Sequence, residues 1–125
     1  MYTSVSICVV VTPEHFENVT DVLVHDAVTL PCKTSPDSSV VWYYQQSCDN
    51  FEHGMYMCSN PIEVAIRNQY QIRRNAPGEI NLLINDVAKT MMGLYTCKDH
   101  YRVHYRVLLN VISKYESLLS GHLYL

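Results

Sequence analysis

Cysteines and histidines are the residues of this sequence that could carry chemistry. The chain of 125 residues has five cysteines, at positions 8, 32, 48, 58 and 97, and six histidines. Thiols form disulfides or bind zinc, but zinc sites draw on closely spaced pairs such as Cys-x-x-Cys, and the sequence has no such pair. Cysteines at these separations, together with the sequon Asn18-Val19-Thr20, favour an extracellular domain with a glycan on Asn18. Because five is an odd number, pairing leaves at least one thiol over.

Two histidines near the end of the chain suggest a metal site or a pH-sensitive surface. His100 and His104 flank a predicted turn, beside Asp99. Zinc needs three or four converging ligands with supporting hydrogen bonds, so we expect no metal site. A pH-sensitive interface is the alternative. Both ideas require the two imidazole rings to point toward one another.

The sequence lacks the motifs of catalysis and of nucleic-acid binding. It has no Gly-x-Ser-x-Gly, no His-Glu-x-x-His and, with only four glycines, no glycine-rich phosphate loop. We therefore expect no enzymatic activity and no cofactor. Nine basic residues against twelve acidic ones give a net charge of −3, which argues against a nucleic-acid partner.

Alternating apolar residues indicate the elements that must position these side chains. Apolar residues recur with a period of two over 28–32, 80–84 and 107–111, as in half-buried strands. Turn residues separate such segments, and no long helical pattern lies between them, which is typical of an all-β sandwich or barrel. Strands are predicted at residues 3–11, 20–24, 27–34, 39–46, 54–58, 62–66, 69–74, 79–85, 93–100 and 104–112.

Length and composition fit one domain. A chain with 48% hydrophobic and 17% charged residues can bury one core, and its length leaves no room for a second. We assign residues 1–112 to the domain and 113–125 to a stalk, a linker or a short helix. No apolar run approaches the roughly 18–20 residues that span a bilayer, so membrane attachment is expected only through segments outside this chain. The apolar N-terminal run lacks a basic first segment and a clear cleavage site, and is predicted as a strand.

Residues of four kinds occur in an order that resembles a known family. Cys32 ends a predicted strand, Trp42 follows ten residues later, and Gly93, Tyr95 and Cys97 form a Gly-x-Tyr-x-Cys run. This order resembles the immunoglobulin superfamily over most of the chain. The resemblance implies a disulfide between Cys32 and Cys97 that joins two sheets, with Trp42 packed on it. It also implies that the Tyr95 hydroxyl bonds to backbone at the E–F corner and that Gly93 permits the turn into the F strand.

The separation of 65 residues between Cys32 and Cys97 resembles the variable type, which has room for C′ and C″ strands. The run Trp42-Tyr43-Tyr44-Gln45 is similar to the Trp-Tyr-x-Gln of such domains. We therefore predict an immunoglobulin-like V-set β-sandwich of about nine antiparallel strands in two sheets. Two departures argue against an antibody or T-cell-receptor chain. Met91 stands where such domains place an Asp that pairs with an Arg near position 67, and the last strand lacks Phe-Gly-x-Gly.

The other cysteines resemble a feature of some innate receptors. Cys48 and Cys58 are similar to the second disulfide, between strands C and C′, of the polymeric immunoglobulin receptor, the triggering receptors on myeloid cells and some fish immune-type receptors. The alternative is two structural cysteines without that relationship. Cys8 is then left in a predicted A strand at the sheet edge. It is either buried as a small apolar residue or bridges to another chain or segment.

The resemblance implies a domain that binds a protein on another cell or in solution, as part of a cell-surface receptor. Variable-type domains bind mostly through the outer face of strands G, F, C and C′, called the GFCC′ face here. Tyrosine and arginine are common at binding hot spots. The candidate contact residues are Tyr44, Gln45, Tyr56, His100, Tyr101, Arg102, His104 and Tyr105.

The alternative function is adhesion or structural assembly. Semaphorins and viral surface proteins also carry this fold, and fold alone does not separate the two functions. An exposed C′ edge would support a symmetric homodimer, which Cys8 could join covalently.

Overall fold

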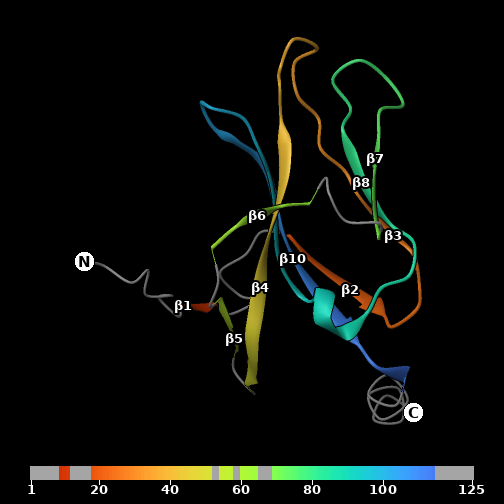
Figure 1. Cartoon of the computed structure of the whole chain (residues 1–125), viewed down its shortest axis with the longest axis vertical. Helices are drawn as coiled ribbons and strands as arrows, with labels where there is room; N and C mark the ends of the chain where they lie inside the picture. The colour runs from red at the N-terminus through yellow and green to blue at the C-terminus, as the bar shows by residue number, and fades with distance from the viewer. Residues whose placement is uncertain (1–8, 12–17, 52–53, 58–59, 65–68, 115–125) are drawn as a thin grey trace.

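The computed structural model describes residues 9–11, 18–51, 54–57, 60–64 and 69–114 (Figure 1). In these residues the chain forms strands and a 3-10 turn, η3 (Lys89–Met91). The described elements confirm the prediction of an all-β fold. The strands are β1 (Val9–Val11), β2 (Val19–Leu23), β3 (Val28–Leu30), β4 (Val41–Phe51), β5 (Gly54–Met57), β6 (Ile62–Glu63), β7 (Tyr70–Arg73), β8 (Asn81–Ile84), β9 (Gly93–Lys98) and β10 (Val103–Ile112).

The strands form two sheets (Figure 1). The larger has the order β1-β5-β4-β9-β10-β2, with β6 also paired to β4, and the smaller has the order β3-β8-β7. The pairs are antiparallel except that β2 runs parallel to β10. In the strand letters of the expected fold, β4, β9 and β10 are C, F and G, and β3, β8 and β7 are B, E and D.

The core lies between the two sheets and is closed by a disulfide. Burial alternates along β9, so that Tyr95 and Cys97 point inward, and Cys97 is bonded to Cys32, two residues after β3 of the opposite sheet. Trp42 is 1% exposed, and its indole N–H donates to the carbonyl of Ile80 at 2.8 Å. The indole nitrogen is the one polar atom of Trp42, the largest core side chain, and this hydrogen bond gives it a partner on the other side of the core. In the chain-entropy account, closing a loop of 65 residues adds about 4 kcal/mol to stability.

The N-terminal strand lies at a different edge from the one expected. The sequence predicts an A strand over 3–11 and a C′ edge open to a second copy. Instead β1 pairs with β5, with Val9 opposite Met57, so the chain's own strand occupies the C′ edge. A run of valines suits a sheet, and pairing satisfies backbone groups that an open edge would expose. Cys8 lies outside the described residues.

The C′ strand is formed in two parts. β5 pairs with the end of β4, and β6 pairs with Tyr43 and Tyr44 nearer the start of β4. Pro61 precedes β6 and cannot donate to a ladder, which suits a break between the two parts. Across the residues that the structure describes, no strand takes the C″ position, although the cysteine separation left room for one.

The predicted second disulfide falls partly outside the described residues. The register between β4 and β5 shifts between Ser47, opposite Met57, and Asp49, opposite Tyr56. Cys48 is therefore the extra residue of a bulge in β4. Cys58 is not among the described residues, and neither are residues 115–125 of the predicted stalk, so both expectations stay predictions.

Candidate binding surface at the F–G hairpin

A carboxylate organises the turn that joins β9 to β10. Oδ1 of Asp99 accepts hydrogen bonds from the backbone N–H groups of Tyr101 at 2.7 Å and Arg102 at 2.9 Å. The backbone N–H of Asp99 donates to the carbonyl of Arg102 at 3.1 Å. An aspartate that accepts from backbone two and three residues ahead is a common way to fix a tight turn.

The second carboxylate oxygen of Asp99 is used by a histidine. Oδ2 lies 2.7 Å from Nε2 of His104, and the two side chains are 11% and 5% exposed. This hydrogen bond, and next the two from backbone, hold the pKa of Asp99 well below its ordinary value. His104 sits where the register between β9 and β10 shifts, which lets its ring reach the turn. Asp99 is therefore ionised and bound on both oxygens.

The histidines do not form a metal site in the described part of the chain, where no three His, Cys, Asp or Glu side chains converge. His104 is directed to Asp99, whereas His100 is exposed at the turn. The metal-site and pH-sensitivity hypotheses both required the rings of His100 and His104 to face one another. The contact that His104 makes is with Asp99 of the turn.

The tip of the hairpin presents exposed side chains. Tyr101 is 93% exposed, and His100 and Arg102 on either side are exposed as well. All three belong to the predicted contact residues. Because Asp99 fixes the backbone at Tyr101 and Arg102, these side chains project from a turn of defined shape.

Next to the hairpin, the outer side of the sheet carries aromatic and basic side chains. Trp42 and Tyr44 point into the core, so Tyr43 and Gln45 lie on the outer side, where both are half-buried. Nζ of Lys98 lies 4.8 Å from the centroid of the Tyr43 ring, a cation–π contact.

Strand β10 shows where the outer face is open. Arg106, opposite Thr96, is exposed. Two residues further along, Leu108 lies opposite Leu94 on the same side of the sheet but is fully buried. The open part of the outer face is thus the part near the hairpin.

Three of the predicted contact residues make contacts within the domain. Tyr44 is 5% exposed, and its hydroxyl lies 2.8 Å from the carbonyl oxygens of Thr90 and Met92. Tyr105 is half-buried with its ring edge-on to Trp42 at 6.2 Å, and burial raises the pKa of its hydroxyl. These two and His104 stabilise the fold, because alternation directs both tyrosines inward. The side chain of Tyr56 lies outside the described part.

Some surface residues were not selected by sequence reasoning. Neither the contact of Lys98 with Tyr43 nor the role of Asp99 in the turn was predicted. A signal for Asp99 was present, since an aspartate at the start of a short connection between two strands is typical of a side-chain-capped turn. For Lys98 the signal was its phase in the strand, because Lys98 directly follows Cys97, which points inward.

The other end of β9 is closed by neutral groups. The Tyr95 hydroxyl donates to the carbonyl of Met91 at 2.8 Å, the corner contact that the resemblance implied. The Tyr70 hydroxyl lies 2.9 Å from that of Tyr95, and it must be the donor because the one Tyr95 proton is already used. Gly93 has φ +152°, and a Cβ there would collide with the backbone oxygen of Gln45. Met91 is buried at the position where an Asp was expected.

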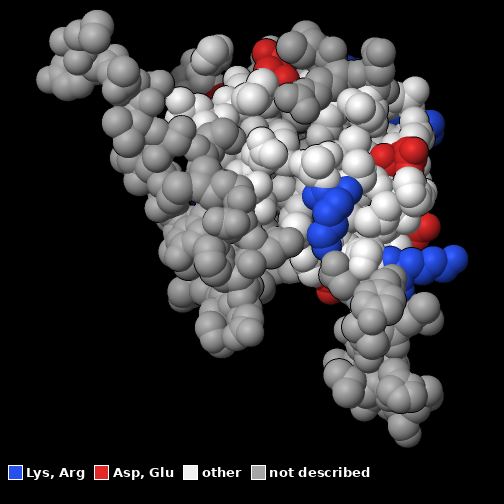
Figure 2. Space-filling model, turned by 60° about the horizontal axis from the view of Figure 1, so that its bottom comes forward, with Lys and Arg blue, Asp and Glu red and all other residues white. Residues whose placement is uncertain are grey.

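Charge and glycosylation add little to the choice of site. Basic and acidic side chains are scattered over the face seen in Figure 2 and do not gather in a patch of one sign. Asn18 is half-buried, and its Nδ2 donates to the carbonyl of Arg106 at 3.2 Å. Its glycosylation stays a prediction.

No helix in the described ranges is long and apolar enough to cross a membrane.

Comparisons with known proteins identify the family. The sequence model of the immunoglobulin V-set domain matches residues 15–112. Among solved structures, the ZIG-8–RIG-5 IG1–IG1 heterodimer is similar, with a TM-score of 0.51 and 16% identity over 81% of this chain and 85% of that chain. The ZIG-8 IG1 homodimer has a TM-score of 0.50 and 15% identity over 88% and 89%. Among curated proteins, none matches this sequence. The chain therefore belongs to the immunoglobulin V-set family.

Proposed function

We propose that this domain is the extracellular recognition domain of a cell-surface receptor, and that it binds another protein through the hairpin end of its GFCC′ face. The F–G hairpin carries the proposal. Tyr101 is almost fully exposed on a turn whose shape is fixed by Asp99. The Tyr101 side chain lies at the tip and contributes nothing to the core, so the stability of the fold does not explain why a tyrosine stands there.

A fixed turn favours binding for a physical reason. Ordering a loop or side chain at an interface costs about 0.5–1.5 kcal/mol for each flexible side chain, and a turn that is already ordered avoids part of that cost. Tyrosine and arginine are the side chains most common at hot spots, and Tyr101 and Arg102 are adjacent here.

The face beside the hairpin suits a partner with acidic or hydrogen-bond-accepting groups. Lys98 and Arg106 lie on its outer side, and Arg102 is exposed at the turn. The nearby carboxylate of Asp99 is already bonded to backbone N–H groups and to His104, so it competes little for these cations. Aromatic groups beside arginine are a common composition of protein-binding surfaces.

A binding screen tests the proposal. The domain fused to an antibody Fc would be offered to displayed cell-surface ectodomains. For a partner found this way, Tyr101→Ala and Arg102→Ala should each weaken binding about tenfold or more. Arg73→Ala is the matched control, since Arg73 is exposed on β7 of the opposite sheet. Unchanged binding by the two hairpin variants, or an equal loss with Arg73→Ala, would contradict this face.

Adhesion through a dimer is the second candidate function. Both similar solved structures are dimers of immunoglobulin domains, one of two copies of ZIG-8 and one of ZIG-8 with RIG-5. Because β1 occupies the C′ edge, a symmetric pair of this domain would use the outer face of the sheet and not that edge. Light scattering after size exclusion, with and without reductant, separates the two functions. A monomer in both conditions argues against the homodimer.

A further inference from the structure

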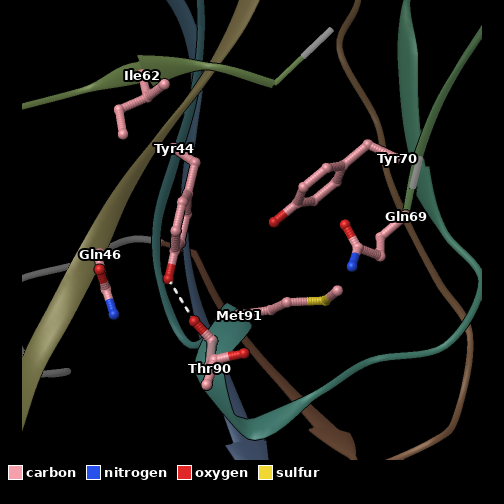
Figure 3. Close-up of a pocket in the computed structure, with 7 residues that line it drawn as sticks. All are labelled: Tyr44, Gln46, Ile62, Gln69, Tyr70, Thr90 and Met91. Carbon is pink, nitrogen blue, oxygen red and sulfur yellow. Dashed lines mark hydrogen bonds between the residues drawn. The ribbon is translucent and has the colours of Figure 1, made fainter. Parts of the chain in front are cut away.

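A pocket of about 140 Å³ lies at the E–F corner, at the opposite end of β9 from the hairpin (Figure 3). It opens between β4 and β6 on one side and the start of β7 on the other, with η3 beneath. The lining residues are Tyr44, Gln46, Ile62, Gln69, Tyr70, Thr90 and Met91.

The inner part of this pocket is buried and presents carbon and sulfur. Tyr44, Tyr70 and Met91 are 5%, 8% and 6% exposed. Both tyrosine hydroxyls bond to other protein groups, Tyr44 to the carbonyls of Thr90 and Met92 and Tyr70 to the hydroxyl of Tyr95. In Figure 3 the Tyr70 ring points toward Tyr44, and the Met91 side chain lies below them. A ligand would therefore meet two aromatic rings and a thioether.

The outer part of the pocket is neutral and polar. Gln46, Gln69 and Thr90 are exposed, as is Ile62 at 44%, and the amide of Gln69 points toward Met91 in Figure 3. None of the lining residues that the structure describes is charged. An ion would find no counter-charge among them, whereas a neutral ligand loses little by leaving water.

Met91 contributes to the neutral lining of the pocket among the residues that the structure describes. Met91 stands where the resemblance led us to expect an aspartate. The corner is held by hydroxyl-to-carbonyl bonds instead, from Tyr95 to Met91 and from Tyr44 to Thr90 and Met92. A thioether contributes no charge, so the inner part of the pocket suits an uncharged group.

We propose that this pocket binds a small neutral molecule that carries one aromatic ring. The pocket volume is close to the roughly 150 Å³ of a cavity that holds benzene, so the pocket fits one ring and not two. Tyrosine rings and methionine sulfur both make favourable contacts with an aromatic ring, at about 0.5–1.5 kcal/mol per contact, which favours a planar ring over a saturated one.

A methyl-NMR titration tests the inference. The protein would be labelled at the methionine methyl carbons and titrated with phenol. The Met91 methyl should shift and saturate, with a Kd on the order of 1 mM, as expected for a ligand of so few atoms. The Met92 methyl is the internal control, because Met92 is equally buried at 6% but does not line the pocket. Cyclohexanol, the saturated analogue, should bind about fivefold more weakly.

A pair of exposed substitutions separates pocket binding from general effects. Gln69→Trp should fill the outer part of the pocket and abolish the saturable shift at Met91. Gln71→Trp, at an exposed position of β7 outside the pocket, should leave it unchanged. Equal shifts of Met91 and Met92, a non-saturating Met91 shift, or full binding by Gln69→Trp would each overturn the inference. Such a failure would leave the hairpin proposal intact, because the two sites share no residue.

Discussion

The two ends of strand β9 are held by different chemistry. At the Gly93 end, the Tyr95 hydroxyl donates to the backbone carbonyl of Met91, and both residues are neutral and buried. At the Lys98 end, the ionised carboxylate of Asp99 accepts from backbone N–H groups and contacts His104. A charge without partners in the core would cost much to desolvate, whereas Asp99, which is 11% exposed, has hydrogen-bond partners on both carboxylate oxygens. The neutral end should therefore support the whole domain, and the ionic end only the hairpin.

Gly93→Ala should break the neutral end most severely. Gly93 has φ +152°, and a Cβ would collide with the backbone oxygen of Gln45 and come within 2.9 Å of Cε1 of Tyr44. Backbone strain and overpacking together should lower the free energy of unfolding by about 3 kcal/mol, measured by chemical denaturation. Thr96→Ala on the same strand is the control and should cost less than about 1 kcal/mol. If Gly93→Ala lowered the free energy of unfolding as little as Thr96→Ala, the result would show that the corner relaxes around the added methyl group.

Tyr95→Phe should have the next largest effect. It removes the donor to the Met91 carbonyl and one partner of the Tyr70 hydroxyl, in a site with no exposure. The expected cost is about 1–3 kcal/mol of unfolding free energy, from the same denaturation measurement. Tyr101→Phe changes the same group at a 93% exposed position and should stay within about 0.5 kcal/mol. Equal effects of the two variants would contradict the importance of the buried hydroxyl.

Asp99→Asn should loosen the hairpin and leave the domain folded. Hydrogen exchange at the amides of Tyr101 and Arg102 should become about tenfold faster, because their acceptor loses its charge. The control is Asp86→Asn, since Asp86 pairs with His25 at 2.9 Å but the two side chains are 71% and 81% exposed. Exposed pairs contribute little, so no change is expected there. A global loss from Asp99→Asn as large as that from Tyr95→Phe would refute the division between the two ends.

Mild acid should have the smallest effect, because the Asp99 carboxylate stays ionised. The pKa of Asp99 is lowered from 3.8, first by the hydrogen bond with His104. A lowered folded-state pKa gives a stabilisation that is complete above the unfolded value and is lost as pH falls through the folded one. Between about pH 7 and pH 5 the Asp99 carboxylate should therefore stay ionised. The carboxyl carbon shift of Asp99 reports this, and a midpoint at or above 3.8 would contradict it.

Much of the fold was predictable because its signals are local. Strands β3, β8 and β10 follow from alternation of apolar residues within a few positions. The sequence also indicates the phase of β4, because a Trp42 that points into the core places Tyr44 inside and Tyr43 on the outer side. The prediction of Tyr44 as a contact residue did not take this phase into account. The pairing of β1 with β5 was not predictable, because nothing near Val9 in the sequence specifies which distant edge it meets.

By itself, the sequence determined the V-set fold and the disulfide between Cys32 and Cys97, because those depend on residue types in a fixed order along the chain. The tertiary structure decided what the remaining polar residues do. It assigned Asp99 and His104 to the turn, covered the C′ edge with β1, and left a neutral pocket beside Met91. Each of these depends on distances between segments far apart in sequence, which only the packed chain sets.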